Sequence, residues 1–294
     1  MLTHLKIGGG ANAYYDCCLV SLITAKQKNP ETNVALVTTE EPPSEYAKAL
    51  RDQGVKIIIC EFKDFLFGDD DPWKWAYFKL NALKYVIEKL EYANVVMLDT
   101  DTIVLQNFST CGMWDDCNNE VLLYPLQHSS VASQMIPMRK SCEELYGRKI
   151  SLIHYGGEFV AGDTKKIAEL LNYCEDIYSE MISKSVGTTQ GDEFLLSVAA
   201  TEHRELIRPA TPFVRREEIG RFYACSTIYL YTDIAVLHLP AGKGTTFPLL
   251  SRYYIKHGGF PRNQSKYYCL PRNKTPMRYF VYKAMVKFMS HKML

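Results

Sequence analysis

The sequence predicts an α/β protein with a mostly parallel central sheet and helices on both faces of that sheet. Short apolar runs typical of buried strands alternate with longer segments whose apolar residues recur at helical spacing. Polar and glycine-rich segments follow several predicted strands, where ligands of such sheets bind. The length of 294 residues and the apolar fraction of 47% fit a soluble protein with one large domain or two small ones.

The elements of the first half alternate regularly. The predicted strands are 5–7, 34–37, 55–60 and 95–98, and the predicted helices run to about residue 26, over about 44–53 and over 75–90. In the second half we expect strands at 121–124 and 235–239, a strand-like aromatic and glycine-rich segment at 153–161, and helices at about 164–183 and 194–200. The loop Gly8–Gly10 lacks the spacing of a dinucleotide-binding loop and the Lys-Ser/Thr of a P-loop.

The most informative segment is Asp99-Thr100-Asp101, which ends the apolar run 95–98. Neighbouring side chains of a strand point to opposite faces, so both carboxylates cannot lie in the core. At the end of a strand that opens into a cleft, they can share a hard divalent cation that also binds phosphate oxygens. The alternative is a pair of solvated aspartates, but the apolar runs on both sides favour a metal and phosphate site.

The net charge of +1 is unevenly distributed. Residues 234–294 contain eleven of the 34 basic residues and no acidic residue, which leaves 23 basic and 33 acidic residues, a net charge of −10, before them. This distribution indicates an anionic partner near the C-terminus. The nine cysteines lack metal-type spacing, no run of 18 apolar residues occurs, and the N-terminus lacks a secretory pattern. We therefore expect a cytoplasmic protein.

Three segments of the second half are further candidates. Gly156-Gly157 interrupts a strand-like sequence, which indicates either a bulge or the close approach of a ligand. Asp192-Glu193 precedes an apolar helix, where acidic residues often only cap the helix. His238 lies in a short apolar strand, where a lone histidine is more often a hydrogen-bonded core residue than a ligand.

Taken together, these segments resemble glycosyltransferases of family 8, the group of glycogenin and the bacterial lipopolysaccharide galactosyltransferases. The resemblance runs from residue 7 to about residue 248. The segment 12–14, with 21–22, resembles the family's nucleoside-binding segment, and 77–80 followed by 95–104 resembles its most specific block. Residues 155–159 stand where the family binds the donor sugar. Residues 192–197 resemble its second acidic motif, and His238 with Gly242 and Lys243 resembles its third metal-ligand segment, with one extra residue after the histidine.

The resemblance implies a GT-A nucleotide-sugar fold over residues 1–250 and a retaining, metal-dependent transfer of a hexose, galactose or glucose, from a UDP-sugar to a hydroxyl of a glycan or glycolipid. It implies Mn²⁺ or Mg²⁺ held by Asp99, Asp101 and His238. It implies Glu193 beneath the anomeric carbon, with Asp192 orienting the sugar hydroxyls. The remaining donor contacts would come from Gly8, Gly9, Asn12, Tyr14, Lys79, Thr100, Gly156, Gly157 and Lys243.

Two departures bear on this resemblance. Ala11 stands where the family usually has an aspartate that reads the base, which weakens the assignment of uracil. The Gly-Gly-Glu and Asp-Glu segments also resemble family 6, the α-galactosyl and blood-group transferases, which share the fold and the retention of configuration.

Two other functions compete. The segment 95–103 also fits a haloacid-dehalogenase-type phosphohydrolase, with Asp99 as the nucleophile, but that family's late Gly-Asp motif is incomplete after Gly191-Asp192. A non-catalytic nucleotide-sugar-binding protein would have no need for the full set of acidic and histidine residues. We expect no nucleic-acid partner, and the sequence does not indicate an oligomeric state.

The last segment, 251–294, is basic and predicts an amphipathic helix. Thr275 and Pro276 fit its first positions, and apolar residues of 277–288 share one face. This helix either binds an anionic membrane surface or packs on the enzyme body.

Overall fold

The computed structural model describes residues 11–68, 71–117, 119–126, 131–187, 190–217, 234–262, 264 and 268. The predicted strand 5–7, the loop Gly8–Gly10 and the predicted C-terminal helix lie outside these residues. The side chain of Asn12 also lies outside the description. For these segments the expectations from the sequence remain predictions.

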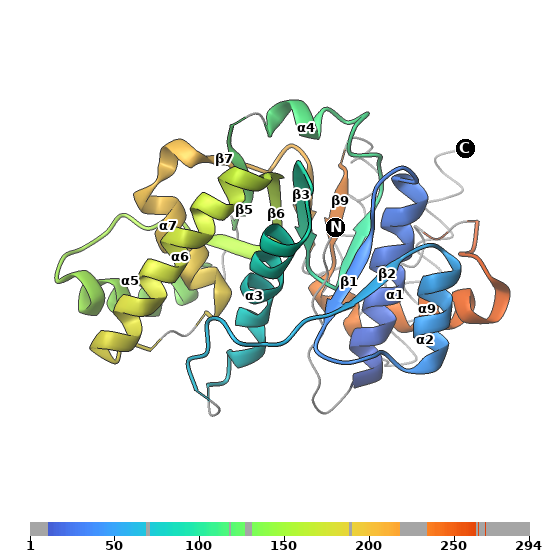
Figure 1. Cartoon of the computed structure of the whole chain (residues 1–294), viewed down its shortest axis with the longest axis horizontal. Helices are drawn as coiled ribbons and strands as arrows, with labels where there is room; N and C mark the ends of the chain where they lie inside the picture. The colour runs from blue at the N-terminus through green and yellow to red at the C-terminus, as the bar shows by residue number, and fades with distance from the viewer. Residues whose placement is uncertain are drawn as a thin grey trace, which may run out of the picture.

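Helices and strands alternate along the chain largely as the sequence predicts (Figure 1). The first half contains α1 (Ala11–Lys28), β1 (Ala35–Thr38), α2 (Ser44–Asp52), β2 (Lys56–Ile59), α3 (Lys74–Lys89), β3 (Asn94–Leu98), β4 (Thr102–Val104) and α4 (Met113–Asp116). The second half contains β5 (Val121–Pro125), α5 (Val131–Tyr146), β6 (Tyr155–Asp163), α6 (Thr164–Lys184), α7 (Asp192–Glu202), η1 (Arg204–Leu206), β7 (Ile207–Pro209), β8 (Val214–Arg216), β9 (Val236–His238), η2 (Pro240–Gly244) and α9 (Thr246–His257).

The sheets are mixed, so the prediction of a mostly parallel sheet is wrong. The four-stranded sheet has the order β3-β6-β5-β7, and β6 runs antiparallel to both of its neighbours. A three-stranded sheet has the order β4-β9-β8, with β4 and β9 antiparallel, and β1 pairs with β2 in parallel. Strands buried on both faces carry the same apolar pattern in either direction, so the sequence does not indicate the direction of β6.

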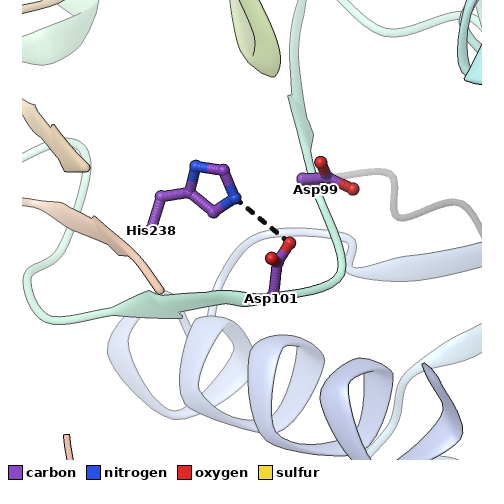
Figure 2. Close-up of side chains that lie close together, drawn as sticks. All are labelled: Asp99, Asp101 and His238. Atoms are coloured by element: carbon purple, nitrogen blue, oxygen red, sulfur yellow. Dashed lines mark ion pairs between the residues drawn. The ribbon is translucent and has the colours of Figure 1, made fainter. Parts of the chain in front are cut away.

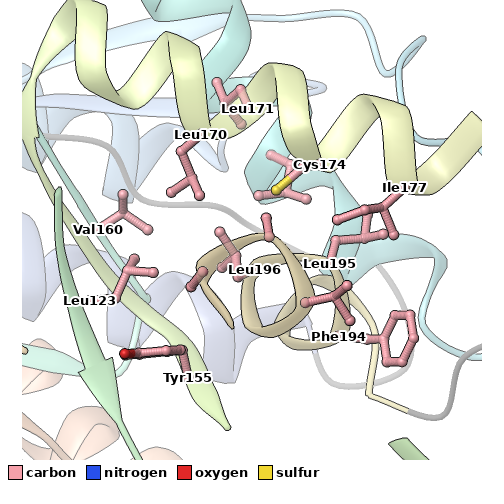
Figure 3. Close-up of a cluster of buried hydrophobic side chains, with 14 of the residues drawn as sticks. Leu123, Tyr155, Val160, Leu170, Leu171, Cys174, Ile177, Phe194, Leu195 and Leu196 are labelled. Atoms are coloured by element: carbon pink, nitrogen blue, oxygen red, sulfur yellow. The ribbon is translucent and has the colours of Figure 1, made fainter. Parts of the chain in front are cut away.

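Both faces of the four-stranded sheet are covered, as predicted. Val95 and Met97 of β3 belong to a core that includes side chains of α3, α6 and α7, and Figure 3 shows part of this core. Val96 and Leu98 of the same strand belong to a second core with side chains of α1 and α2. The alternation of side chains along the strand therefore divides one apolar run between two cores.

Helix α9 was not predicted, and it crosses the expected domain boundary at residue 250. It packs on α1 and α2, and its Leu250 and Tyr254 are buried. Among the described helices, none is long and apolar enough to cross a membrane. The described cysteines are all free.

Candidate active site

The predicted Asp99-Thr100-Asp101 segment forms the turn between two sheets. It follows β3 of the four-stranded sheet and precedes β4 of the three-stranded sheet. The Asp99 carboxylate accepts a hydrogen bond from the Thr100 N–H (3.0 Å), and the Thr102 hydroxyl donates to the Asp99 carbonyl (2.8 Å). These local bonds fix the turn in which both aspartates leave the strand.

The turn brings both aspartates next to His238 (Figure 2). Strand β9 pairs with β4 so that His238 lies opposite Thr102, and the Leu239 N–H donates to the Asp101 carbonyl (2.9 Å). One ligand atom from each of Asp99, Asp101 and His238 lies within 4.8 Å of the others. We call these three residues the Asp–Asp–His cluster.

The donor atoms of this cluster fit a divalent cation. Both carboxylate oxygens of Asp101 are buried and accept no hydrogen bond. Their nearest positive groups are His238 Nε2 at 3.2 Å and Lys243 Nζ at 3.1 Å. Each oxygen of Asp101 therefore has an ion-pair partner, and a cation that took the place of the histidine's proton would find two carboxylates and an imidazole within reach of one another. Carboxylate oxygens and an imidazole nitrogen are ligands that Mn²⁺ accepts, and the carboxylates also suit Mg²⁺.

The charges of the cluster depend on one another. Burial alone would raise the pKa of Asp101, but His238 and Lys243 hold it well below its usual range. Burial alone would lower the pKa of His238, but Asp101 and Glu158 raise it to about 9. The histidine therefore carries a proton in the metal-free protein at neutral pH, and it must lose that proton to bind a metal.

Two further charged residues contact this cluster, Glu158 directly through His238 and Arg216 through Glu158. Glu158 of β6 is fully buried, and its Oε1 lies 3.3 Å from His238 Nδ1. The guanidinium of Arg216, on β8, lies 3.2 Å from the same oxygen. His238 and Arg216 hold the pKa of Glu158 at about 2, although burial alone would raise it. Neither Glu158 nor Arg216 was predicted as a site residue.

The predicted lysines lie on two sides of the cluster. Lys243, in η2, pairs with Asp101 and lies 5.6 Å from the centre of the Tyr14 ring, and its side chain is 38% exposed. Lys79, on α3, is buried, and its Nζ lies 2.8 Å from Asp192 Oδ2 and 3.8 Å from Asp99 Oδ2. Lys79 therefore connects the Asp–Asp–His cluster to the second acidic motif.

Asp192 and Glu193 form the first turn of α7. The helix begins after Gly191, whose φ of +57° favours glycine, and no side chain caps it. Burial, with the charges of Glu193 and Asp99, raises the pKa of Asp192 to about 7 against the effect of Lys79. The neighbouring carboxylates outweigh burial and raise the pKa of Lys79, so Asp192 is the member of this pair that takes up a proton.

Glu193 has a different partner. Its Oε2 lies 2.8 Å from His154 Nε2, and the Glu193 side chain is 21% exposed, against 3% for Asp192. The His154 side chain is fully buried. We call Lys79, Asp192, Glu193 and His154 the lysine–carboxylate cluster. The two acidic residues therefore do more than cap a helix, which was the alternative interpretation.

Gly156 and Gly157 lie where β6 bulges. One step along β5, from Leu123 to Tyr124, corresponds to four along β6, from Val160 to Gly156. A Cβ on Gly156 would lie 1.7 Å from Glu158 Oε2, and one on Gly157 would lie 2.0 Å from Asp192 Oδ2. The backbone at these two glycines is therefore packed closely against the carboxylates of Glu158 and Asp192, and their role in binding a sugar stays a prediction.

Local sequence signals predicted some of this site. The structure brings the predicted residues Asp99, Asp101, His238, Lys79, Lys243, Asp192 and Gly157 into one connected network. Glu193 is next to this network in sequence but contacts His154. The residues that the sequence analysis missed are Glu158, Arg216 and His154. Glu158 and His154 lie within the aromatic and glycine-rich segment that was singled out, whereas no signal marked Arg216.

Comparisons with known proteins bear on the fold. No family model matches the sequence, and no curated protein matches it. Among solved structures, the apo form of mouse xyloside xylosyltransferase 1 is similar, with a TM-score of 0.53 and 12% identity, over 81% of this chain and 96% of that one. The Asp–Asp–His cluster and its connected lysines therefore lie in a chain whose fold is similar to that of this xylosyltransferase.

Proposed function

We propose that this protein is a metal-dependent, retaining glycosyltransferase that moves a hexose from a UDP-sugar to a hydroxyl of a glycan or glycolipid. The observation that carries the proposal is the Asp–Asp–His cluster, whose three ligand atoms lie within 4.8 Å of one another, in a fold similar to that of a xylosyltransferase. The joint arrangement of Asp99, Lys79 and Asp192 supports membership of family 8, and the family 6 resemblance implies the same reaction class.

The Asp–Asp–His cluster and Lys243 fit the diphosphate end of the donor. Asp99, Asp101 and His238 would hold a divalent ion, which would supply Lewis-acid stabilisation of the leaving diphosphate. Asp99 is the most exposed of the three, with 23% of its side chain accessible, so it faces the space open to a donor. Lys243 is partly exposed beside Asp101 and adds positive charge where the leaving group becomes negative.

The lysine–carboxylate cluster fits the sugar end. Asp192 carries the oxygen that accepts hydrogen bonds from sugar hydroxyls, and Lys79 holds this carboxylate next to Asp99. Glu193 supplies the carboxylate that stabilises positive charge at the anomeric carbon or attacks that carbon. His154 donates to Glu193 and orients it. A trapped glycosyl–Glu193 adduct would separate the covalent route from the front-face route, in which the leaving phosphate acts as the base.

The decisive experiment is a calorimetric titration of the protein with UDP-galactose or UDP-glucose, first with Mn²⁺ and then with a chelator. We expect affinity to fall at least tenfold when the metal is removed. Equal affinity in both conditions would contradict the metal bridge. Donor that binds with metal but never turns over, with any acceptor or water, would favour a non-catalytic binding protein. Rapid phosphate release from a simple phosphate ester would favour the phosphohydrolase.

The identity of the base is tested separately, because Ala11 replaces the aspartate that usually reads uracil in the family. We expect UDP-sugars to bind more tightly than GDP- or CMP-sugars of the same hexose. A preference for another base would show that the nucleoside end has diverged while the metal and sugar ends remain.

The basic C-terminal segment supports a further part of the proposal, a glycolipid acceptor at a cytoplasmic membrane surface. Residues 234–294 carry eleven basic and no acidic residues. The full chain should sediment with anionic vesicles at low salt, and a chain ending at Lys274 should not. If the full chain does not sediment, the predicted amphipathic helix packs on the enzyme and the acceptor is not tied to a membrane.

A further inference from the structure

One buried residue contacts both ends of the Asp–Asp–His cluster. The carbonyl of Glu158 accepts a hydrogen bond from the Asp99 N–H (2.9 Å), and its carboxylate Oε1 lies 3.3 Å from His238 Nδ1. Asp99 follows β3, Glu158 belongs to β6, and His238 belongs to β9, so this contact joins the four-stranded sheet to the three-stranded sheet.

The chemistry of this contact fixes which nitrogen of His238 is free. An ionised carboxylate only accepts hydrogen bonds, so the Nδ1 that faces Glu158 must carry the proton. The other nitrogen, Nε2, faces Asp101 at 3.2 Å (Figure 2). A neutral His238 that keeps its Nδ1 proton therefore presents the Nε2 lone pair to the metal position.

The surroundings of Glu158 hold its carboxylate in this place. The Arg216 guanidinium lies 3.2 Å from Oε1 and balances the buried charge. The second oxygen, Oε2, lies over Gly156 at a position that any other residue would occupy with its Cβ, which would be 1.7 Å away. The bulge of β6, Gly156 and Arg216 together hold the Glu158 carboxylate next to Nδ1 of His238.

We propose that Glu158 is a positioning residue that fixes the tautomer and ring orientation of His238 and thereby sets the metal affinity of the site. This role rests on the proposed metal-dependent function. Carboxylates behind metal-binding histidines typically contribute about 10- to 100-fold in metal affinity. Nothing in the sequence marked Glu158 for this role, since its contacts to His238 and Arg216 come from distant strands.

The test measures the binding of Mn²⁺ alone, by calorimetry without nucleotide sugar. Glu158→Gln keeps the shape of the side chain and removes its charge, and we expect about 10- to 100-fold weaker Mn²⁺ binding. Glu217→Gln is the matched control, because Glu217 is also buried and pairs with an arginine, Arg215, at 2.9 Å. The control should bind Mn²⁺ within about twofold of the wild type.

Two results would overturn the positioning role: Mn²⁺ binding by Glu158→Gln within about twofold of the wild type, or equal weakening in Glu158→Gln and Glu217→Gln. Gly156→Ala is a second variant, which displaces the Glu158 side chain without changing a charge, and it should weaken binding in the same direction. Wild-type protein that binds no Mn²⁺ would instead contradict the proposed metal site itself.

A measurement on the wild type decides the role if these variants do not fold. Long-range ¹H–¹⁵N correlation spectra of histidine-labelled protein with Zn²⁺, a diamagnetic substitute for Mn²⁺, identify the protonated nitrogen of His238. A proton on Nδ1 with the metal on Nε2 supports the role of Glu158. A proton on Nε2 with the metal on Nδ1 overturns it.

Discussion

The two clusters of the site differ in how their carboxylates are satisfied. In the Asp–Asp–His cluster, both oxygens of the buried Asp101 lack a hydrogen bond, and their nearest positive groups lie beyond 3.0 Å. In the lysine–carboxylate cluster, Asp192 has a buried lysine at 2.8 Å and Glu193 has a histidine at 2.8 Å. Asp192 Oδ2 also lacks a hydrogen bond, so the clusters differ in their positive partners. Asp101 faces a histidine, whose proton a cation could replace, and a partly exposed lysine, whereas Asp192 faces a buried lysine.

The largest expected effect is the loss of the metal. Asp101→Ala should abolish metal-dependent donor binding and lower kcat/KM at least about a thousandfold, or roughly 4 kcal/mol. It should also abolish the rise in unfolding temperature that Mn²⁺ causes in the wild type. Asp16→Ala is the control for the loss of a buried aspartate outside the cluster. Asp16 lies on α1 and accepts a hydrogen bond from the Tyr46 hydroxyl. Normal metal-dependent donor binding by Asp101→Ala would contradict the distinction between the two clusters.

The second effect concerns stability. Among the described ion pairs, Lys79 is the only positive group within 4 Å of Asp192. Lys79→Met removes this group and should lower the free energy of unfolding by about 3 kcal/mol. Lys84→Met is the matched control on the same helix. Lys84 pairs with Asp64 and Glu175 but is 23% exposed, so its loss should cost about 1 kcal/mol or less. Denaturant unfolding of the metal-free proteins measures both values, and equal losses would contradict the distinction.

The third effect separates chemistry from binding. Glu193→Gln keeps a hydrogen-bonding side chain beside His154 but removes the negative charge that we assign to the anomeric carbon. We expect unchanged Mn²⁺-dependent donor binding and about a hundredfold lower kcat, or roughly 2.7 kcal/mol. Steady-state kinetics and calorimetry on the same preparation give the two values. A near-normal kcat would assign the anomeric carbon to another group.

The smallest effect, taken over one pH unit, is a pH dependence of stability. The folded protein holds the pKa of Asp192 at about 7, above its ordinary value of 3.8, so the folded state binds the proton more tightly. The stabilisation is therefore complete below the unfolded pKa and is lost as the pH rises through about 7. Between about pH 5 and 6, this group should lower the free energy of unfolding by at most about 1.4 kcal/mol per pH unit.

Asp192→Asn removes the group that titrates, so the difference between variant and wild type isolates its contribution. Metal-free urea unfolding at several pH values should give a steeper decline for the wild type between about pH 5 and 6. Parallel pH profiles for the two proteins would mean that Asp192 stays ionised throughout this range.

The amino-acid sequence by itself determined most helices and strands, because their signals are local. The apolar run of β3 and the Asp99–Asp101 turn were recognisable from neighbouring residues, and the structure has both. Two long helices, α5 and α9, were missed. A proline at position 137 lies within α5, so that sequence resembles a loop. Pro248 lies in the first turn of α9, which a helix tolerates, so it does not explain why α9 was missed.

The tertiary structure alone decided how the site is assembled. The direction of β6 was not predictable, since a strand buried on both faces has the same apolar pattern in either direction. Glu158 and Arg216 are 58 positions apart in sequence, and Glu158 and His238 are 80 apart, so only the pairing of distant strands brings them together. The residues that could hold a cation are visible in the sequence as chemical types. Which carboxylate contacts the histidine or the arginine follows only from packing, because charge balance in a buried site depends on residues that are distant in the sequence.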